Sequence, residues 1–122
     1  MAIQSEGRYA AEFMLYDELR ISRDEVTLAA GTSGQILAAG TVLGKITTDG
    51  KYTAYDDGLS NGAQTAVAVL LSPVDITADV TAVVIARFAA VKTAALQWHA
   101  DADATAKTAA YTALASKHII VR

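Results

Sequence analysis

The strongest structural signal in the sequence is the segment at residues 39–55, AGTVLGKITTDGKYTAY. Its β-branched and aromatic residues favour strands, and Gly40 and Gly44 mark places where the chain bends or approaches another backbone. Between the two halves, Asp49-Gly50 favours a two-residue type I′ turn. The segment therefore predicts a β-hairpin, and with it a domain that is mainly β.

Four further segments outside this hairpin are predicted to form strands. Residues 66–71 form a continuous apolar run typical of a buried strand, and the only proline, Pro73, follows it. Residues 80–88 are rich in β-branched side chains, and the shorter segments 26–28 and 118–121 have the same character. Turn-forming residues separate the segments, at 31–34, 56–58 and 61–62. About six or seven strands are expected.

Helices are predicted only as small additions in the C-terminal third. Residues 94–98 have some helical character. Asp101 or Asp103 is suited to cap a helix from Ala104 to about Ala115, because alanine favours the helix strongly. Its expected anchors on the body are Tyr111 and Leu114. The predicted fold class is mainly β with small α additions.

The composition limits the possible classes of protein. A chain of 122 residues is expected to form one domain, and about a fifth of its residues are alanine, so the core is thin and oligomer contacts are expected to support it. The absence of cysteine excludes disulfides and thiol chemistry, and the two histidines, far apart, offer few zinc ligands. No metal site and no cofactor are therefore expected. Without a membrane-length apolar run or a signal peptide, we expect a soluble protein made in a cytoplasm, with no membrane partner.

The net charge of −3 lies in the N-terminal segment. Residues 1–25 contain three arginines and six acidic residues, whereas the rest of the chain holds seven of each sign. A nucleic-acid-binding protein would present a basic patch. With none in the sequence, nucleic acid is not an expected partner.

Residues 1–24 are expected to form an arm, followed by a body at residues 25–122. Between Phe13 and Ile21 the odd positions are mostly apolar, a weak two-residue period typical of a strand. A helix over residues 10–19 is the alternative, because its aromatic residues would share one face. The arm is expected either to fray in solvent or to become ordered on a partner.

No group of residues has the spacing of a catalytic site. His99 and His118 lack a recognisable partner pattern, and no serine lies in a nucleophile-elbow context. Asp56-Asp57-Gly58 has the composition of a turn. Lys51 lies at the expected hairpin tip, where lipoyl and biotinyl carrier proteins present their modified lysine. Those carriers are symmetric barrels of two matching halves, and this sequence shows no second half. The sequence therefore predicts no enzyme.

An ordered set of segments resembles the bacteriophage head decoration protein family, which includes the lambda head decoration protein. The resemblance covers nearly the whole chain, from about Glu12 to Arg122, and is weakest over the first dozen residues. The segments that carry it are residues 21–27, 39–47, 50–52, 66–71, 74–75, 82–87, 96–98 and 119–122.

The resemblance implies a β-clip-like body with an extended N-terminal arm, assembled as a homotrimer. It implies that trimers bind the three-fold and quasi-three-fold sites of the expanded icosahedral head, where they clamp the major capsid protein against DNA pressure. The expected location is the outer surface of the virion, after synthesis in the host bacterial cytoplasm. No catalytic residues come with the family.

In this family the arm reaches the capsid, and here that role falls on the segment before Val26. We expect it to bind by strand addition, in which backbone hydrogen bonds provide affinity and alternate side chains select the register. The alternative is that the arm docks on the protein's own body. The apolar capsid-contact candidates are Phe13, Leu15, Leu19 and Ile21, and Arg20 and Arg23 are candidates to pair with capsid carboxylates.

Other interpretations stay open at this point. A small trimeric β-clip enzyme or ligand-binding module would need polar groups in a subunit cleft, and its only candidates are Asp56, Asp57, His99 and His118. A host-attachment surface domain is a further alternative.

Five alanines are expected either to permit close contact within a trimer or to fill a small core: Ala63, Ala66, Ala68, Ala89 and Ala90.

Overall fold

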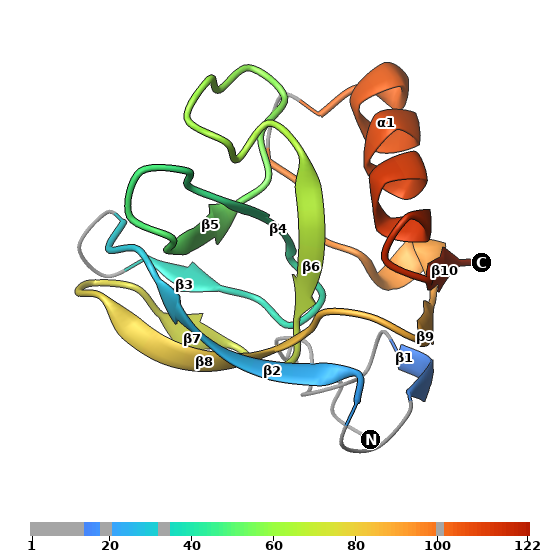
Figure 1. The fold of residues 1–122 in the computed structure, drawn as a ribbon, viewed down its shortest axis with the longest axis horizontal. Coiled ribbons are helices and arrows are strands. Elements are labelled where there is room, and N and C mark those ends of the chain that lie inside the picture. The colour runs from blue at the N-terminus through green and yellow to red at the C-terminus, as the bar shows by residue number, and fades with distance from the viewer. Residues whose placement is uncertain (1–13, 18–20, 32–34, 100–101) are drawn as a thin grey trace, which may run out of the picture.

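The computed structural model describes residues 14–17, 21–31, 35–99 and 102–122. Within these residues the chain forms ten strands, one α-helix and one 3₁₀ turn (Figure 1). The strands are β1 (Met14–Asp17), β2 (Arg23–Leu28), β3 (Ile36–Leu37), β4 (Val42–Lys45), β5 (Tyr52–Ala54), β6 (Ala66–Leu70), β7 (Val74–Asp75), β8 (Val80–Ile85), β9 (Ala89–Val91) and β10 (Ile119–Val121). The helix is α1 (Ala104–Ala115), and the 3₁₀ turn is η1 (Thr93–Ala95). The predicted class, mainly β with small α additions, is confirmed.

Five strands close into a small barrel in the order β2-β5-β4-β6-β8. Its longest pairing is between antiparallel β2 and β8, from Arg23 opposite Ile85 to Leu28 opposite Val80. β4 pairs antiparallel with both β5 and β6, and β6 pairs with β8. A parallel contact between Leu28 and Tyr52 closes the ring. Every barrel strand is therefore paired on both sides, and the loops that leave the barrel start from strands held in this way.

The predicted hairpin forms as β4 and β5, but its turn differs from the prediction. The Ile46 N–H donates to the Lys51 carbonyl at 2.8 Å, and the Gly50 N–H donates to the Ile46 carbonyl at 2.9 Å. Gly50 has a φ of +73°, whereas Asp49 is not among the residues with positive φ. A type I′ turn needs positive φ at both central residues. The two-residue turn is therefore wrong, and the longer loop 47–50 joins the strands.

Three short strands, β3, β7 and β9, were not predicted. β3 pairs with β7, and β9 is the centre of a second sheet, antiparallel to β1 and parallel to β10. β1 confirms the strand interpretation for residues 14–17 and shows that the alternative helix over residues 10–19 is wrong for these four residues. The helical character predicted at 94–98 is limited to η1.

The core consists of two clusters of buried side chains. One fills the barrel around Leu28, Leu43 and Val84, and the other joins the barrel to α1, β9 and β10. Four of the five singled-out alanines are at most 4 % exposed and so fill this core, as one of the two alternatives predicted: Ala63, Ala66, Ala68 and Ala89.

The helix α1 begins where the sequence predicted. Asp103 is its N-cap, and the carboxylate accepts a hydrogen bond of 2.8 Å from the Ala106 N–H. Leu114 is fully buried against the second core cluster, and the Tyr111 ring meets Trp98 edge to face at 5.7 Å. Both predicted anchors therefore face the body.

Within the described residues, no helix has the length and apolar character needed to cross a membrane.

Candidate functional site

The structure describes only part of the predicted capsid-contact segment. Leu15 lies in β1, which pairs with β9 of the protein's own second sheet. Ile21 precedes the barrel and is 48 % exposed, and Arg23, also exposed, is the first residue of β2. The other three candidates lie outside the described residues: Phe13, Leu19 and Arg20.

Residues 21–24 are held against the end of β8. The Arg87 guanidinium donates hydrogen bonds to the Ile21 carbonyl and to both carboxylate oxygens of Asp24. The hydrogen bond from Arg87 to the Asp24 carboxylate raises the pKa of the guanidinium. Ser22 is buried, and its hydroxyl donates to the Phe88 carbonyl at 2.7 Å. The last residues of the predicted arm are therefore a fixed part of the body.

Next to this segment, two residues with left-handed backbone stack their aromatic rings. Phe88 and His118, with φ of +49° and +61°, immediately precede the parallel strands β9 and β10. Their rings stack at 5.1 Å with an interplanar angle of 5°. Phe88 is 46 % exposed, as is Ile120 of β10. Left-handed backbone at a non-glycine residue carries a cost and is concentrated at functional sites, so this apolar region is a candidate contact surface.

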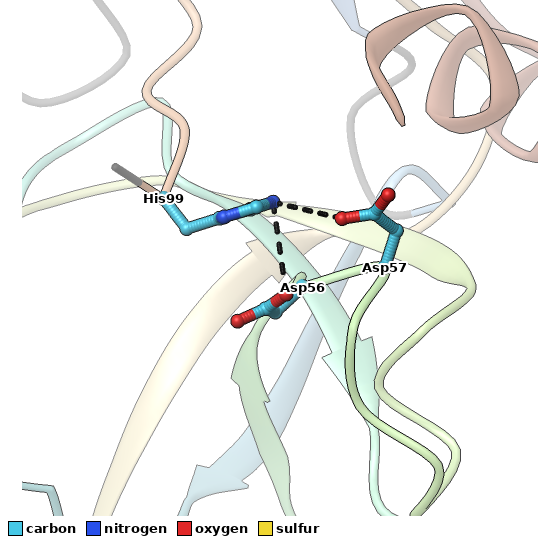
Figure 2. A group of neighbouring side chains, drawn as sticks. All are labelled: Asp56, Asp57 and His99. Atoms are coloured by element: carbon cyan, nitrogen blue, oxygen red, sulfur yellow. Dashed lines mark ion pairs between the residues drawn. The ribbon is translucent and has the colours of Figure 1, made fainter. Parts of the chain in front are cut away.

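A second candidate is a cluster of three ionisable side chains. Asp56 and Asp57 follow β5, and His99 lies in the segment between η1 and α1 (Figure 2). The His99 Nε2 lies 3.4 Å from the Asp57 Oδ1 and 3.8 Å from the Asp56 Oδ1. Only 12 % of the His99 side chain is exposed, against 38 % and 46 % for the two aspartates. The imidazole thus approaches two solvent-accessible carboxylates from inside the molecule.

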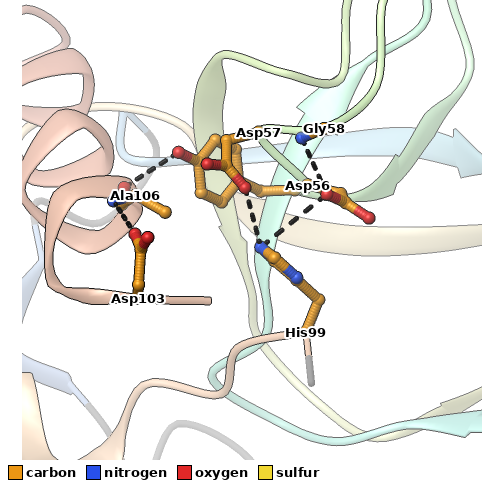
Figure 3. A network of polar contacts seen from close by, with 7 residues as sticks. Asp56, Asp57, Gly58, His99, Asp103 and Ala106 are labelled. Atoms are coloured by element: carbon orange, nitrogen blue, oxygen red, sulfur yellow. Dashed lines mark hydrogen bonds and ion pairs between the residues drawn. The ribbon is translucent and has the colours of Figure 1, made fainter. Parts of the chain in front are cut away.

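The surrounding structure fixes the cluster on both sides (Figure 3). The Gly58 N–H donates to the Asp56 Oδ1 at 2.9 Å, which confirms the turn predicted at residues 56–58. The buried Tyr55 hydroxyl donates to the Ala106 carbonyl at 2.8 Å, and the Tyr55 ring meets His99 edge to face at 6.1 Å. Burial, with smaller contributions from nearby aspartates, raises the pKa of Tyr55. The cluster is therefore attached to both β5 and α1.

Sequence reasoning named these residues but did not bring them together. More than forty positions separate the aspartates from His99, and no local spacing indicates their contact. His118, the fourth candidate, stacks on Phe88 instead. The structure therefore gathers three of the four residues.

A family model matches residues 3–119 of the chain. It describes a class of structural protein, the decoration proteins of phage heads. The chain belongs to the family described as Bacteriophage lambda head decoration protein D. Comparison with curated proteins gave no match.

Membership in this family supports a role in phage capsid decoration. It implies association with the phage capsid and a location at the capsid surface of the virion. The family is one of structural capsid decoration proteins and is not known as an enzyme family.

Proposed function

We propose that this chain is a cement protein with a β-clip-like body, whose homotrimers bind the three-fold and quasi-three-fold sites of the expanded icosahedral head. The observation that carries the proposal is the family match over residues 3–119. A trimer that binds only the assembled, expanded lattice lowers the free energy of that state and so stabilises it against DNA pressure. A three-fold trimer also matches the symmetry of a three-fold site. The protein is made in the host bacterial cytoplasm and added to the outer surface of the head.

In this proposal the first 24 residues act as the capsid-binding arm, and residues 25–122 are the decoration domain. Residues 21–24, held by Arg87 and by the contact from Ser22 to Phe88, form the root of the arm. Three arms rooted in one trimer share a high effective concentration, so weak single contacts add to tight binding.

The outer edge of β1 is the proposed attachment site for a strand of the major capsid protein. Among the described strands β1 pairs only with β9, so its other edge has no partner within the described part of the chain. An added strand would extend this sheet through backbone hydrogen bonds. The proposed apolar contacts are Phe13, Leu15, Leu19 and Ile21, and the proposed charged contacts are Arg20 and Arg23.

A matched pair of substitutions tests the arm root without cutting the chain. Ile21 is 48 % exposed beside the root, and Ile36 is 64 % exposed on β3, in a different sheet. We expect Ile21→Ser to weaken binding to expanded heads that lack the decoration protein, measured by co-sedimentation, and Ile36→Ser to leave binding unchanged. Equal binding by both variants and the unaltered protein would count against a capsid contact at Ile21.

Deletion of residues 1–20 tests the part of the arm that precedes its root. It removes β1 but keeps Ser22, Arg23 and the rest of the barrel strand β2. We expect a folded protein, checked by circular dichroism, that no longer coats expanded heads. Undiminished coating would show that residues 1–20 of the arm are not required.

Light scattering of the purified protein tests the oligomeric state. We expect a trimer, or an equilibrium between monomer and trimer, because the proposed binding sites have three-fold symmetry. A stable dimer would contradict this part of the proposal.

A further inference from the structure

The Nε2 atom of His99 is buried and has no hydrogen-bond partner among the described residues. Buried polar atoms in folded proteins are nearly always paired, because an unpaired one keeps the full cost of leaving water. Two charged atoms of the described residues lie near it, the Asp57 Oδ1 at 3.4 Å and the Asp56 Oδ1 at 3.8 Å. The fold therefore points a buried nitrogen that makes no hydrogen bond within the described residues at two carboxylates.

The two separations from the His99 Nε2 to the aspartate oxygens are close to those of neighbouring ligands around a metal ion. Zinc binds imidazole nitrogen and carboxylate oxygen at about 2.0–2.2 Å, so neighbouring ligand atoms in a tetrahedral site lie about 3.3–3.6 Å apart. The two nitrogen–oxygen distances, 3.4 and 3.8 Å, are close to this range. One ligand atom from each of the three residues lies within 4.8 Å of the others. Small rotations of the exposed aspartates would complete the geometry.

The chemistry of the donors selects a class of cation. Two carboxylates balance the charge of a divalent ion, and a neutral imidazole adds a nitrogen donor that suits zinc and the later first-row metals better than magnesium or calcium. We propose that Asp56, Asp57 and His99 bind a divalent transition-metal cation of the zinc class, with water at the remaining positions. The sequence predicted no metal site because its two histidines lie far apart, but this site needs only one of them.

The position of the site gives the cation a structural role. It links the turn after β5 to the segment that leads into α1, two regions more than forty residues apart in sequence. A cation that binds the folded chain and not the unfolded one raises the melting temperature, and the rise grows with the logarithm of the cation concentration once that concentration exceeds the Kd. This role is independent of capsid binding, so the two proposals stand or fall separately.

Thermal denaturation of the tag-free, full-length protein tests the site with zinc chloride as the probe and magnesium chloride as the comparison. At a zinc concentration about a hundred times the Kd, we expect the melting temperature to rise by about 5 °C or more. Magnesium should give no comparable rise. No rise with zinc would overturn the proposal and would leave an ion pair between the protonated imidazole and the carboxylates as the explanation of the cluster.

Matched variants identify the residues that bind. His99→Gln and Asp57→Asn should abolish the zinc-dependent rise, and His118→Gln, at the exposed histidine stacked on Phe88, should keep it. Asp57 is 46 % exposed, so Asp57→Asn tests the site even if the largely buried His99 position does not tolerate substitution. A rise that persists in both site variants would show that zinc binds elsewhere and would overturn the assignment.

Cobalt(II) provides a spectroscopic test of direct coordination. We expect visible absorption bands from the bound ion in the unaltered protein and in His118→Gln, and their loss in His99→Gln and Asp57→Asn. Absence of such bands in the unaltered protein, or identical bands in all four proteins, would contradict coordination by this cluster.

Discussion

The hydroxyl of Tyr55 donates a hydrogen bond of 2.8 Å to the carbonyl oxygen of Ala106, joining the end of β5 to the first turn of α1. The same Ala106 residue donates its N–H to the Asp103 carboxylate. Ala106 in the first turn of the helix is thus hydrogen-bonded both to the barrel, through Tyr55, and to the N-cap residue Asp103 (Figure 3). Because Tyr55 is only 2 % exposed, the contact is protected from water and fixes where the helix meets the barrel.

Tyr55→Phe should lower the free energy of unfolding by about 1–2 kcal/mol, because it leaves the Ala106 carbonyl without its side-chain donor. Urea denaturation measures the change. Tyr52→Phe is the control, since the described hydrogen bonds do not include the Tyr52 hydroxyl, and we expect a change below about 0.5 kcal/mol. A similar loss in both variants would show that the bond to Ala106 contributes nothing specific.

The raised pKa of Tyr55 predicts a loss of stability in alkaline solution. Burial disfavours the phenolate, so the folded protein holds the proton more tightly than the unfolded chain does. The contribution of the protonated Tyr55 to the free energy of unfolding is therefore complete below the ordinary tyrosine pKa, about 10. It is lost as the pH rises through the raised pKa of the folded protein. The measurement is the free energy of unfolding from pH 8 to above pH 10.

In Tyr55→Phe, the free energy of unfolding should decline less steeply over the same pH range than in the unaltered protein. Lys51 remains in both proteins, and its own pKa, raised mainly by a hydrogen bond to Asp79, contributes a decline of the same sign. The difference between the two curves therefore isolates Tyr55. Parallel curves would contradict the prediction.

Asp103→Ala should destabilise the protein by about 0.5–2 kcal/mol, because the Ala106 N–H loses the acceptor that caps α1. Asp103→Asn keeps a side-chain oxygen at the cap and should retain most of the stability. Thermal or urea denaturation compares the two, and the expectation fails if asparagine and alanine prove equally costly.

Gly44→Ala should destabilise the protein by about 1–3 kcal/mol through overpacking. A Cβ at Gly44 would lie 2.5 Å from the Cα of Ala63, and backbone there cannot move away cheaply. Gly58→Ala is the control, because its Cβ would meet only the Asp56 carboxylate, at 3.3 Å, and the expected change is below about 0.5 kcal/mol. Equal stabilities for the two variants would refute the close contact.

Elements with a strong local pattern were predictable from sequence. The Asp103 cap and the alanine-rich run after it indicated α1, and the β-branched run indicated β8. The turn after β4 was not predictable in detail, because the Asp49-Gly50 dipeptide also fits a longer loop in which Gly50 alone takes a positive φ. The two- and three-residue strands β3, β7 and β9 carry too few residues to show a period.

The sequence by itself determined the class of fold, the hairpin, the capped helix and the resemblance to head decoration proteins, since each depends on neighbouring residues or on their order along the chain. Only the tertiary structure decided that the barrel closes through Leu28 and Tyr52 and that β1 joins β9. It also decided that His99 faces Asp56 and Asp57. These contacts join residues far apart in sequence, so they arise from packing of the whole chain and leave no local pattern to detect.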